Sequence, residues 1–302
     1  MNKQRITVGT RGSELALVQA SAVEAALAAA FPGLTIERRV IRTTGDRRTD
    51  VALAEVAQAE GIIDKGVFIK ELEVALADGA IDLAVHSLKD LPTVLDAGFK
   101  MAAVLERAPV RDVVVRRAGG GLAGLAAGAV AGTSSVRRAR QLRWLRPDLL
   151  VADIRGNVPT RLAKLAAGEF DAILLAEAGL VRLGHDPARG IEVDGAHLAC
   201  DVLDETFFFP AAGQGAIGLE IRAGDEHAAA AVAALNHADT WWRVIAEREF
   251  LRLLEAGCHT PVGVWTAIDG GNLRMEARVF PDDGGDPLTG ACLLYTSPSP
   301  RD

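Results

Sequence analysis

Short apolar runs alternate with amphipathic stretches over the first two thirds of the chain, which is typical of an α/β fold with a parallel sheet. The apolar runs predict strands at Arg5–Gly9, Thr35–Ile41, Asp82–His86, Met101–Leu105, Asp112–Val115, Ala129–Ala131, Leu150–Asp153 and Asp171–Leu175. The stretches between them predict helices at Glu14–Ala30, Val67–Ala77, Val136–Leu145, Val158–Ala166 and Glu177–Leu183. Three helices are followed by a glycine where a left-handed residue often ends a helix, namely Gly33, Gly79 and Gly168.

The pattern changes from Ala228 onward. Two helices are predicted there, at Ala228–His237 and Thr240–Leu254. Two strand-like runs follow, at Val262–Ile268 and Leu273–Phe280. This order predicts a small α+β unit at the end of the chain.

Two segments interrupt the regular pattern. Thr43–Gly66 is polar, has no convincing period and lies between two well-predicted elements. Loops of this length inside compact domains often serve as lids, so we expect a lid here. A break near Glu106–Arg111 predicts the first domain boundary.

Composition limits the classes of protein that fit. A chain of 302 residues that is 49% hydrophobic can bury a large core and form two or three domains. It holds no apolar run long enough to cross a bilayer, and its N-terminus enters a predicted strand without a secretory segment, so we expect a cytoplasmic protein without membrane contact. Three cysteines give no disulfide framework. Since no Cys, His or Asp grouping has metal-ligand spacing, we expect no metal.

Arginines gather in three short stretches beside Gly, Ser, Thr or Asn. These are GTRGS (Gly9–Ser13), GTSSVRR (Gly132–Arg138) and RGNVPTR (Arg155–Arg161). Each is predicted to lie at a strand-to-helix turn, where free backbone N–H groups bind anions and arginine adds a fork that fits a carboxylate. The chain carries a formal charge of −7, so these are local basic pockets. They indicate a small polyanionic ligand and no nucleic acid, which would need a broad basic face.

Two further places carry candidate chemistry. Lys89 and Asp90 follow the predicted strand Asp82–His86, and the carboxyl end of a parallel strand is the usual ligand crevice. Cys258 lies between Gly257 and His259 in a predicted loop, where a thiol can be a nucleophile or a covalent attachment point.

Taken together, these segments resemble the porphobilinogen deaminase family, also called hydroxymethylbilane synthases. The combination of HSLKD, GTSSVRR and a single AGC is highly specific for it. The matching stretches occur in the family's order, at Gly9–Ala20, Lys65–Leu76, Asp82–Pro92, Gly132–Leu142, Arg155–Leu165, Ala178–Gly184, Pro210–Glu220 and Glu255–Gly263.

The resemblance implies an α/β fold with two doubly wound domains, built like the lobes of a periplasmic binding protein, and a small α+β C-terminal domain. It implies that residues 1–105 with 206–223 form domain 1, that 106–205 form domain 2 and that 224–291 form domain 3. The last eleven residues, Cys292–Asp302, do not read like the rest and fit translated library-adapter DNA. We therefore expect residues 292–302 to be non-native and domain 3 to be truncated.

The resemblance also implies a cytoplasmic, monomeric transferase of tetrapyrrole (heme or chlorophyll) biosynthesis. Such an enzyme condenses four porphobilinogen molecules head to tail, with loss of ammonia, to give hydroxymethylbilane. Growth begins on one dipyrromethane cofactor, held by a thioether to the cysteine that matches Cys258.

Residue roles follow from the same resemblance. Asp90 is the expected catalytic residue. The cofactor is expected to contact Lys89, Asp90, Ser135, Arg137, Arg138 and Arg155. The substrate is expected to contact Arg11, Ser13, Phe68, Arg155, Arg161 and Arg182.

Two alternatives belong to other classes. A solute-binding protein would share two lobes and anion-binding arginines, but the missing secretory segment and the unit that carries Cys258 argue against it. A thiol hydrolase would pair Cys258 with His259, yet adjacent residues rarely orient as nucleophile and base, and it would not need the clustered arginines.

Overall fold

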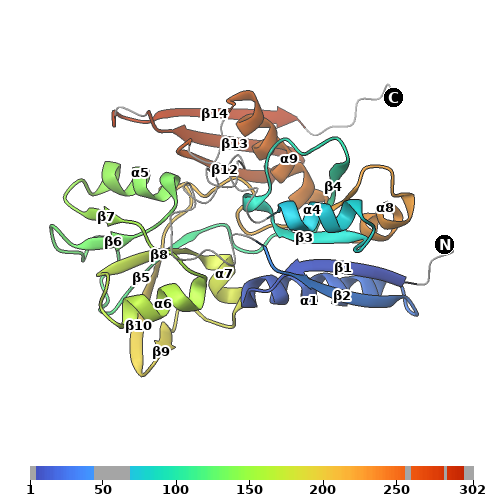
Figure 1. Cartoon of the computed structure of the whole chain (residues 1–302). Helices are drawn as coiled ribbons and strands as arrows, with labels where there is room; N and C mark the ends of the chain where they lie inside the picture. Colours follow the sequence, from blue (N-terminus) through green and yellow to red (C-terminus); the bar gives the residue numbers. More distant parts are fainter. Residues whose placement is uncertain (1–4, 44–68, 256–259, 282–283, 296–302) are drawn as a thin grey trace.

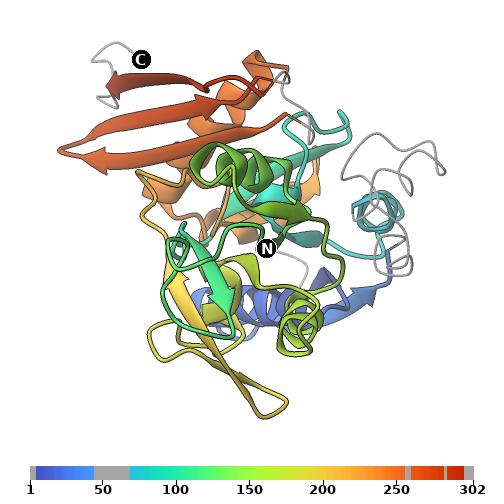
Figure 2. The same cartoon turned by 90° about the vertical axis from the view of Figure 1, so that its left-hand side faces the viewer.

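The computed structural model describes residues 5–43, 69–255, 260–281 and 284–295 (Figures 1 and 2). The described chain forms three sheets with helices packed against them. In Figure 1 the first sheet lies at the lower right, the second at the left and the third above both. This arrangement confirms the predicted α/β class with a small C-terminal α+β unit.

The first sheet has the strand order β2-β1-β3-β11-β4. Its strands are β1 (Arg5–Arg11), β2 (Thr35–Ile41), β3 (Leu83–Ser87), β4 (Phe99–Val104) and β11 (Ile217–Arg222). Helices α1 (Glu14–Ala30) and α8 (Glu226–Ala233) cover one face, where Val23 and Val232 join the apolar core. Helix α4 (Lys70–Ala77) covers the other face through Leu72 and Leu76. The unit is therefore doubly wound, as predicted.

The second sheet has the order β7-β6-β8-β5-β10-β9. Its strands are β5 (Asp112–Arg116), β6 (Val130–Gly132), β7 (Leu150–Ala152), β8 (Ala172–Ala176), β9 (Ile191–Val193) and β10 (Ala196–Val202). The helices are α5 (Val136–Leu145), α6 (Val158–Ala166) and α7 (Glu177–Arg182). Leu142 of α5 and Leu162 of α6 belong to two different apolar clusters, so helices cover both faces of this sheet too.

The third sheet contains β12 (Val262–Asp269), β13 (Asn272–Val279) and β14 (Leu288–Tyr295), with α9 (Ala238–Leu253) packed on it. Strand β14 pairs antiparallel with β13 and passes through Cys292, with Met275 opposite it. The non-native origin expected for residues 292–302 is not tested by this pairing and stays a prediction.

The expectation of parallel sheets is wrong in part, because both large sheets are mixed. Strands β2, β1 and β3 are parallel, whereas β11 is antiparallel to both β3 and β4. In the second sheet β5 is antiparallel to β8 and β10. These strands enter their sheets from linkers or a hairpin, without the helical crossover that makes neighbouring strands parallel.

The chain passes between the two large sheets twice. It leaves the first sheet after β4, builds the second sheet, and returns to add β11. The first passage contains the break predicted at Glu106–Arg111. Both passages lie beside the place where the carboxyl ends of strands from the two sheets face each other, and this is where the candidate site lies.

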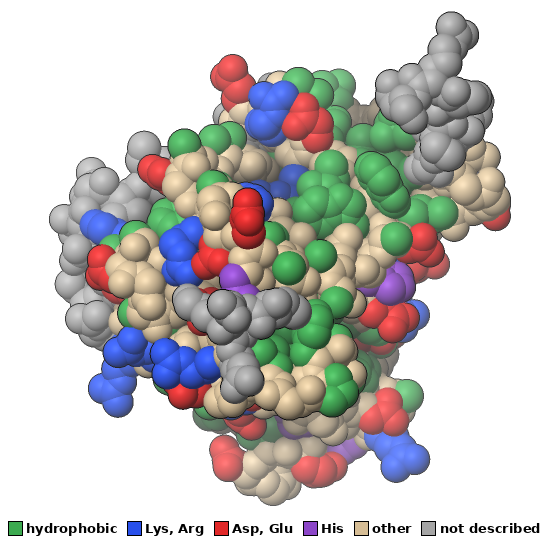
Figure 3. All heavy atoms as spheres, turned by 90° about the vertical axis from the view of Figure 1, so that its right-hand side faces the viewer, with side chains coloured by type: hydrophobic (Ala, Val, Ile, Leu, Met, Phe, Trp, Pro, Cys, Tyr) green, Lys and Arg blue, Asp and Glu red, His purple; other side chains and the backbone are tan. Residues whose placement is uncertain are grey.

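Within the described residues, no helix has both the length and the apolar character needed to cross a membrane. On the face drawn in Figure 3, Lys and Arg side chains are interspersed with Asp and Glu.

Candidate functional site

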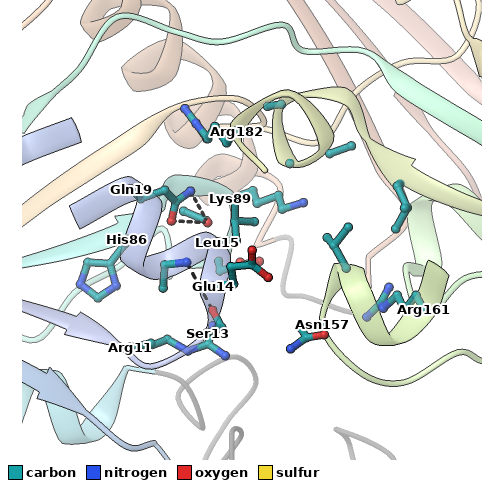
Figure 4. A pocket seen from close by; sticks show the side chains of 18 of the residues that line it. Arg11, Ser13, Glu14, Leu15, Gln19, His86, Lys89, Asn157, Arg161 and Arg182 are labelled. Atoms are coloured by element: carbon teal, nitrogen blue, oxygen red, sulfur yellow. Dashed lines mark hydrogen bonds between the residues drawn. The ribbon is translucent and has the colours of Figure 1, made fainter. Parts of the chain in front are cut away.

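A cleft of about 790 Å³ lies between the two large sheets. One wall comes from the turn after β1, the first turns of α1 and the end of β3. The other comes from the starts of α5, α6 and α7, and Gly213, Gly215 and Ala216 of the returning chain also line the cleft. Figure 4 shows the two walls facing each other across an open space.

The end of β1 places Arg11 in the cleft, and the turn after it places Ser13 there. Ser13 has extended backbone angles and its side chain accepts a hydrogen bond from the Ala16 N–H, so it caps α1. The cap holds the first turn of α1 with its free N–H groups toward the cleft, which favours an anion there.

Lys89 and Asp90 lie on a single 3₁₀ turn, Leu88–Asp90, directly after β3. Both line the cleft. Gly213 packs against this turn with φ +70°, and a Cβ at this position would lie 3.1 Å from the backbone nitrogen of Lys89. Glycine permits both the positive φ and the close approach of the two backbone segments. Burial lowers the pKa of Lys89 to about 8, against the opposing effect of the Asp90 charge.

The opposite wall supplies four arginines, Arg138, Arg155, Arg161 and Arg182. Asn157 caps α6 by accepting from the Thr160 N–H at 3.0 Å, and Arg161 Nε donates to the Gly156 carbonyl at 2.7 Å. Arg182 Nη2 donates to the Gly215 carbonyl at 2.7 Å. Burial lowers the pKa of Arg161 and of Arg182 to about 10, so both remain cations at neutral pH.

Arg137 and Ser135 lie beside the cleft and are not among the described residues that line it. Arg137 Nη1 donates to Asp112 Oδ2 and to the Phe209 carbonyl, both at 2.6 Å. Ser135 caps α5 by accepting from the Arg138 N–H at 3.4 Å. Their expected contacts with the cofactor stay predictions, and the contacts seen here hold α5 in place.

The cleft wall includes further residues to which the sequence gave no functional role. Gln19 exchanges hydrogen bonds of 2.8 and 3.1 Å with Ser87, joining α1 to β3. His86 is buried and pairs with Glu220 at 2.8 Å. Glu14 and Asn157 also line the cleft. For Glu14 the available signal was its place directly after the predicted anion-binding stretch Gly9–Ser13, and for Asn157 its place within the stretch Arg155–Arg161.

Three expectations fall on residues that the structure does not describe. Cys258 lies within 256–259 and Phe68 lies within 44–68. The expected lid, Thr43–Gly66, lies outside the described residues except for Thr43.

As a whole, the described cleft wall gathers seven cationic side chains from both sheets in the same cleft as Asp90, namely Arg11, Arg42, Lys89, Arg138, Arg155, Arg161 and Arg182. Such a wall can bind several carboxylates at once, because a guanidinium can hold one in a bidentate pair. Arg138 already donates through Nε and Nη2 to Asp112. A carboxylate held among these cations can stabilise a transient positive charge and accept a proton.

Two family models match the chain. One, described as "Porphobilinogen deaminase, dipyromethane cofactor binding domain", matches residues 6–230. The other, described as "Porphobilinogen deaminase, C-terminal domain", matches residues 241–289.

Relatives named porphobilinogen deaminase include three bacterial proteins. The one from Syntrophobacter fumaroxidans is 46% identical over 94% of this chain and 87% of its own length. Those from Moorella thermoacetica and Roseiflexus sp. are 47% and 45% identical, over 94% and 93% of this chain and 85% and 88% of their own lengths.

Similar solved structures include the methionine binding protein MetQ and the periplasmic VFT2 domain of BvgS from Bordetella pertussis. MetQ is 12% identical, with a TM-score of 0.47 over 85% of this chain and 97% of its own. The BvgS domain is 15% identical, with a TM-score of 0.46 over 83% of this chain and 92% of its own.

Proposed function

The chain belongs to the porphobilinogen deaminase family, and we propose that it condenses four porphobilinogen molecules head to tail to give hydroxymethylbilane. One ammonia molecule leaves for each bond formed, and one water molecule supplies the hydroxyl group when the product is released. The observation that carries the proposal is the cleft whose wall combines seven cationic side chains with Asp90.

Substrate charge explains the cations. Each porphobilinogen brings an acetate and a propionate, so a growing chain accumulates carboxylates inside the cleft. A buried carboxylate without a partner is costly, and each cation on the wall removes that cost for one side chain. We assign Arg11, Ser13, Arg155, Arg161 and Arg182 to the substrate carboxylates.

The residues present also fit the dipyrromethane named in the matched family model. Lys89, Arg138 and Arg155 line the cleft, and their cationic groups suit the carboxylates of two linked pyrroles. We assign the covalent bond to the Cys258 sulfur, and contacts to Ser135 and Arg137 complete the proposed set. When bound, the dipyrromethane supplies the free pyrrole carbon that receives the first substrate unit.

Asp90 is assigned to the chemical step, in which it stabilises a cation and accepts a proton. When the bond between the methylene carbon and the amine nitrogen of porphobilinogen breaks, its electron pair leaves with the nitrogen as ammonia. The pyrrole nitrogen's electrons form the double bond of a cationic azafulvene, and a carboxylate beside that N–H stabilises the cation. After the new carbon–carbon bond forms, the acceptor ring loses one α proton, which an Asp90 oxygen accepts.

Several finer points belong to the same proposal. We divide the chain into domain 1 (1–105 with 206–223), domain 2 (106–205) and domain 3 (224–291), with α8 of domain 3 packed on the sheet of domain 1. We infer a monomeric, cytoplasmic enzyme without nucleic acid or membrane partners. The return of β11 to the first sheet supports the discontinuous domain 1. Phe68 and the Thr43–Gly66 lid are proposed to cover a bound pyrrole.

The test is product stoichiometry. Purified protein is incubated with porphobilinogen, and the consumed substrate, released ammonia and hydroxymethylbilane are measured together. The proposal expects four substrate molecules and four ammonia molecules for each hydroxymethylbilane. Binding of porphobilinogen without ammonia release would instead indicate the solute-binding alternative.

A further inference from the structure

The cleft wall is strongly cationic, yet two acids line it. Among the described lining residues, seven are Lys or Arg, and the only carboxylates are Asp90 and Glu14. Asp90 is already assigned to the pyrrole ring. Glu14 has no role in the proposed reaction, and the sequence did not single it out.

Glu14 is the first residue of α1, directly after the capping Ser13. It is exposed to the cleft and makes no hydrogen bond or ion pair with any described residue. Figure 4 shows it on the same wall as Arg11 and Ser13, with Asn157 and Arg161 across the open space. Its carboxylate is thus available to a ligand that enters the cleft.

The substrate carries one group that the arginines cannot bind. Porphobilinogen has two carboxylates but also an aminomethyl group, which is an ammonium at neutral pH. Seven cations repel that ammonium while they attract the carboxylates. A second carboxylate on the wall offsets the repulsion and fixes which end of the monomer points inward.

We propose that Glu14 binds the ammonium group of the incoming porphobilinogen and so orients the monomer before its amine leaves. The inference rests on the proposed function, since it names the residue that binds the ammonium group of the proposed substrate. An acid in the first turn of a helix also stabilises the helix itself, through the helix dipole. The test therefore has to separate substrate binding from helix stability.

Glu226 provides the matched control. It is the first residue of α8, directly follows the capping Asp225, is exposed, and does not line the cleft. Glu14→Gln and Glu226→Gln remove the same charge from the same helix position. Both variants should melt at nearly the same temperature, because the two helix ends are alike.

The expected result is a selective loss of affinity. Glu14→Gln should raise the KM for porphobilinogen about three- to tenfold, the range for a partly solvated charged contact. Its kcat should change less than about twofold, because the ammonium is bound before its carbon–nitrogen bond breaks and the contact is not strengthened in that step. Glu14→Asp should recover part of the loss, and Glu226→Gln should match wild type.

A neutral analogue makes the test specific. A porphobilinogen analogue with a methyl in place of the aminomethyl group keeps both carboxylates but lacks the ammonium and cannot lose ammonia. Its inhibition constant should be the same for wild type and Glu14→Gln. A KM change below threefold, an equal loss of affinity for the analogue, or a Glu14→Asp KM no lower than that of Glu14→Gln would overturn the inference. Those results with an active wild type leave the proposed function intact, whereas a wild type that makes no hydroxymethylbilane would overturn both.

Discussion

Asp112 lies against Arg137 in the interior between the cleft and the returning chain, with 2.6 Å between Asp112 Oδ2 and Arg137 Nη1. The other carboxylate oxygen accepts from Arg138 Nε and Nη2 at 3.0 and 2.7 Å. Asp112 is fully buried at the start of β5. One carboxylate therefore binds both arginines of the GTSSVRR stretch. Of these two arginines, only Arg138 lines the cleft.

The first prediction concerns this ion pair. Asp112→Asn should lower the unfolding free energy by about 3–5 kcal/mol, because it leaves buried cations without their counter-charge. The two arginines lower the pKa of Asp112 to about 2, against the effect of burial, from an ordinary value of 3.8. The difference in unfolding free energy between wild type and Asp112→Asn should thus be complete above about pH 4 and disappear as the pH falls toward 2.

Denaturant unfolding at pH 7, 4 and 2.5 measures this prediction. Glu249→Gln is the control, because the Glu249–Arg252 pair is exposed and should contribute little. A difference in unfolding free energy between wild type and Asp112→Asn that stays constant over this pH range would contradict the ion-pair account.

The second prediction concerns Lys89. Its pKa lies near 8, so the amine loses its positive charge as the pH rises through that value. The kcat/KM for porphobilinogen, which reports ionisations of the free enzyme, should fall above about pH 8. Lys89→Arg keeps its charge throughout, so its profile should be flat there. A wild-type profile that stays flat to pH 9.5, or an equal fall in the variant, would argue against a charged Lys89 contact.

The sequence alone predicted the helices around the site well. Helices α1, α5 and α6 have the predicted bounds, because Ser13, Ser135 and Asn157 are local capping signals that act within one helical turn. Arg11, Ser13, Lys89 and Asp90 lie in the cleft for the same reason, since short turns after strands position them.

What the sequence did not predict depends on contacts between distant segments. Asp112, the partner of Arg137, lies 25 residues away on strand β5, so no local pattern reveals that the Arg137 side chain is buried in an ion pair. The hairpin of β9 and β10 had a usable signal that was missed. Asp194 and Gly195 join the two strands with φ of 50° and 81°, as an Asp-Gly turn favours.

The third prediction concerns Asp90. Asp90→Asn keeps the shape but cannot stabilise a cationic pyrrole or accept its proton, so turnover should fall at least about a hundredfold. Asp90→Glu keeps the charge and should retain more activity than Asn. Porphobilinogen consumption by the purified, cofactor-loaded variants gives the comparison. Turnover close to wild type in Asp90→Asn would remove Asp90 from the reaction.

The fourth prediction concerns Arg182. This side chain reaches from α7 to the Gly215 carbonyl of the returning chain, and we expect it to bind later units more than the first. Arg182→Ala should slow later additions and let partly extended enzyme accumulate, as seen by separating the enzyme–pyrrole species. Arg143→Ala removes an exposed cation outside the cleft and is the control. The same distribution of species in both variants would show that Arg182 does not act at that stage.

The most direct test of the account is the mass of the intact, denatured protein. A porphobilinogen deaminase should carry a dipyrromethane that survives denaturation, and we predict that Cys258→Ser lacks this mass and forms no hydroxymethylbilane. Cys200→Ser, which alters a half-buried thiol on β10, should carry the full mass and keep its activity. A wild-type protein that forms hydroxymethylbilane at the mass of the bare polypeptide, or a Cys258→Ser variant that keeps the added mass, would contradict it.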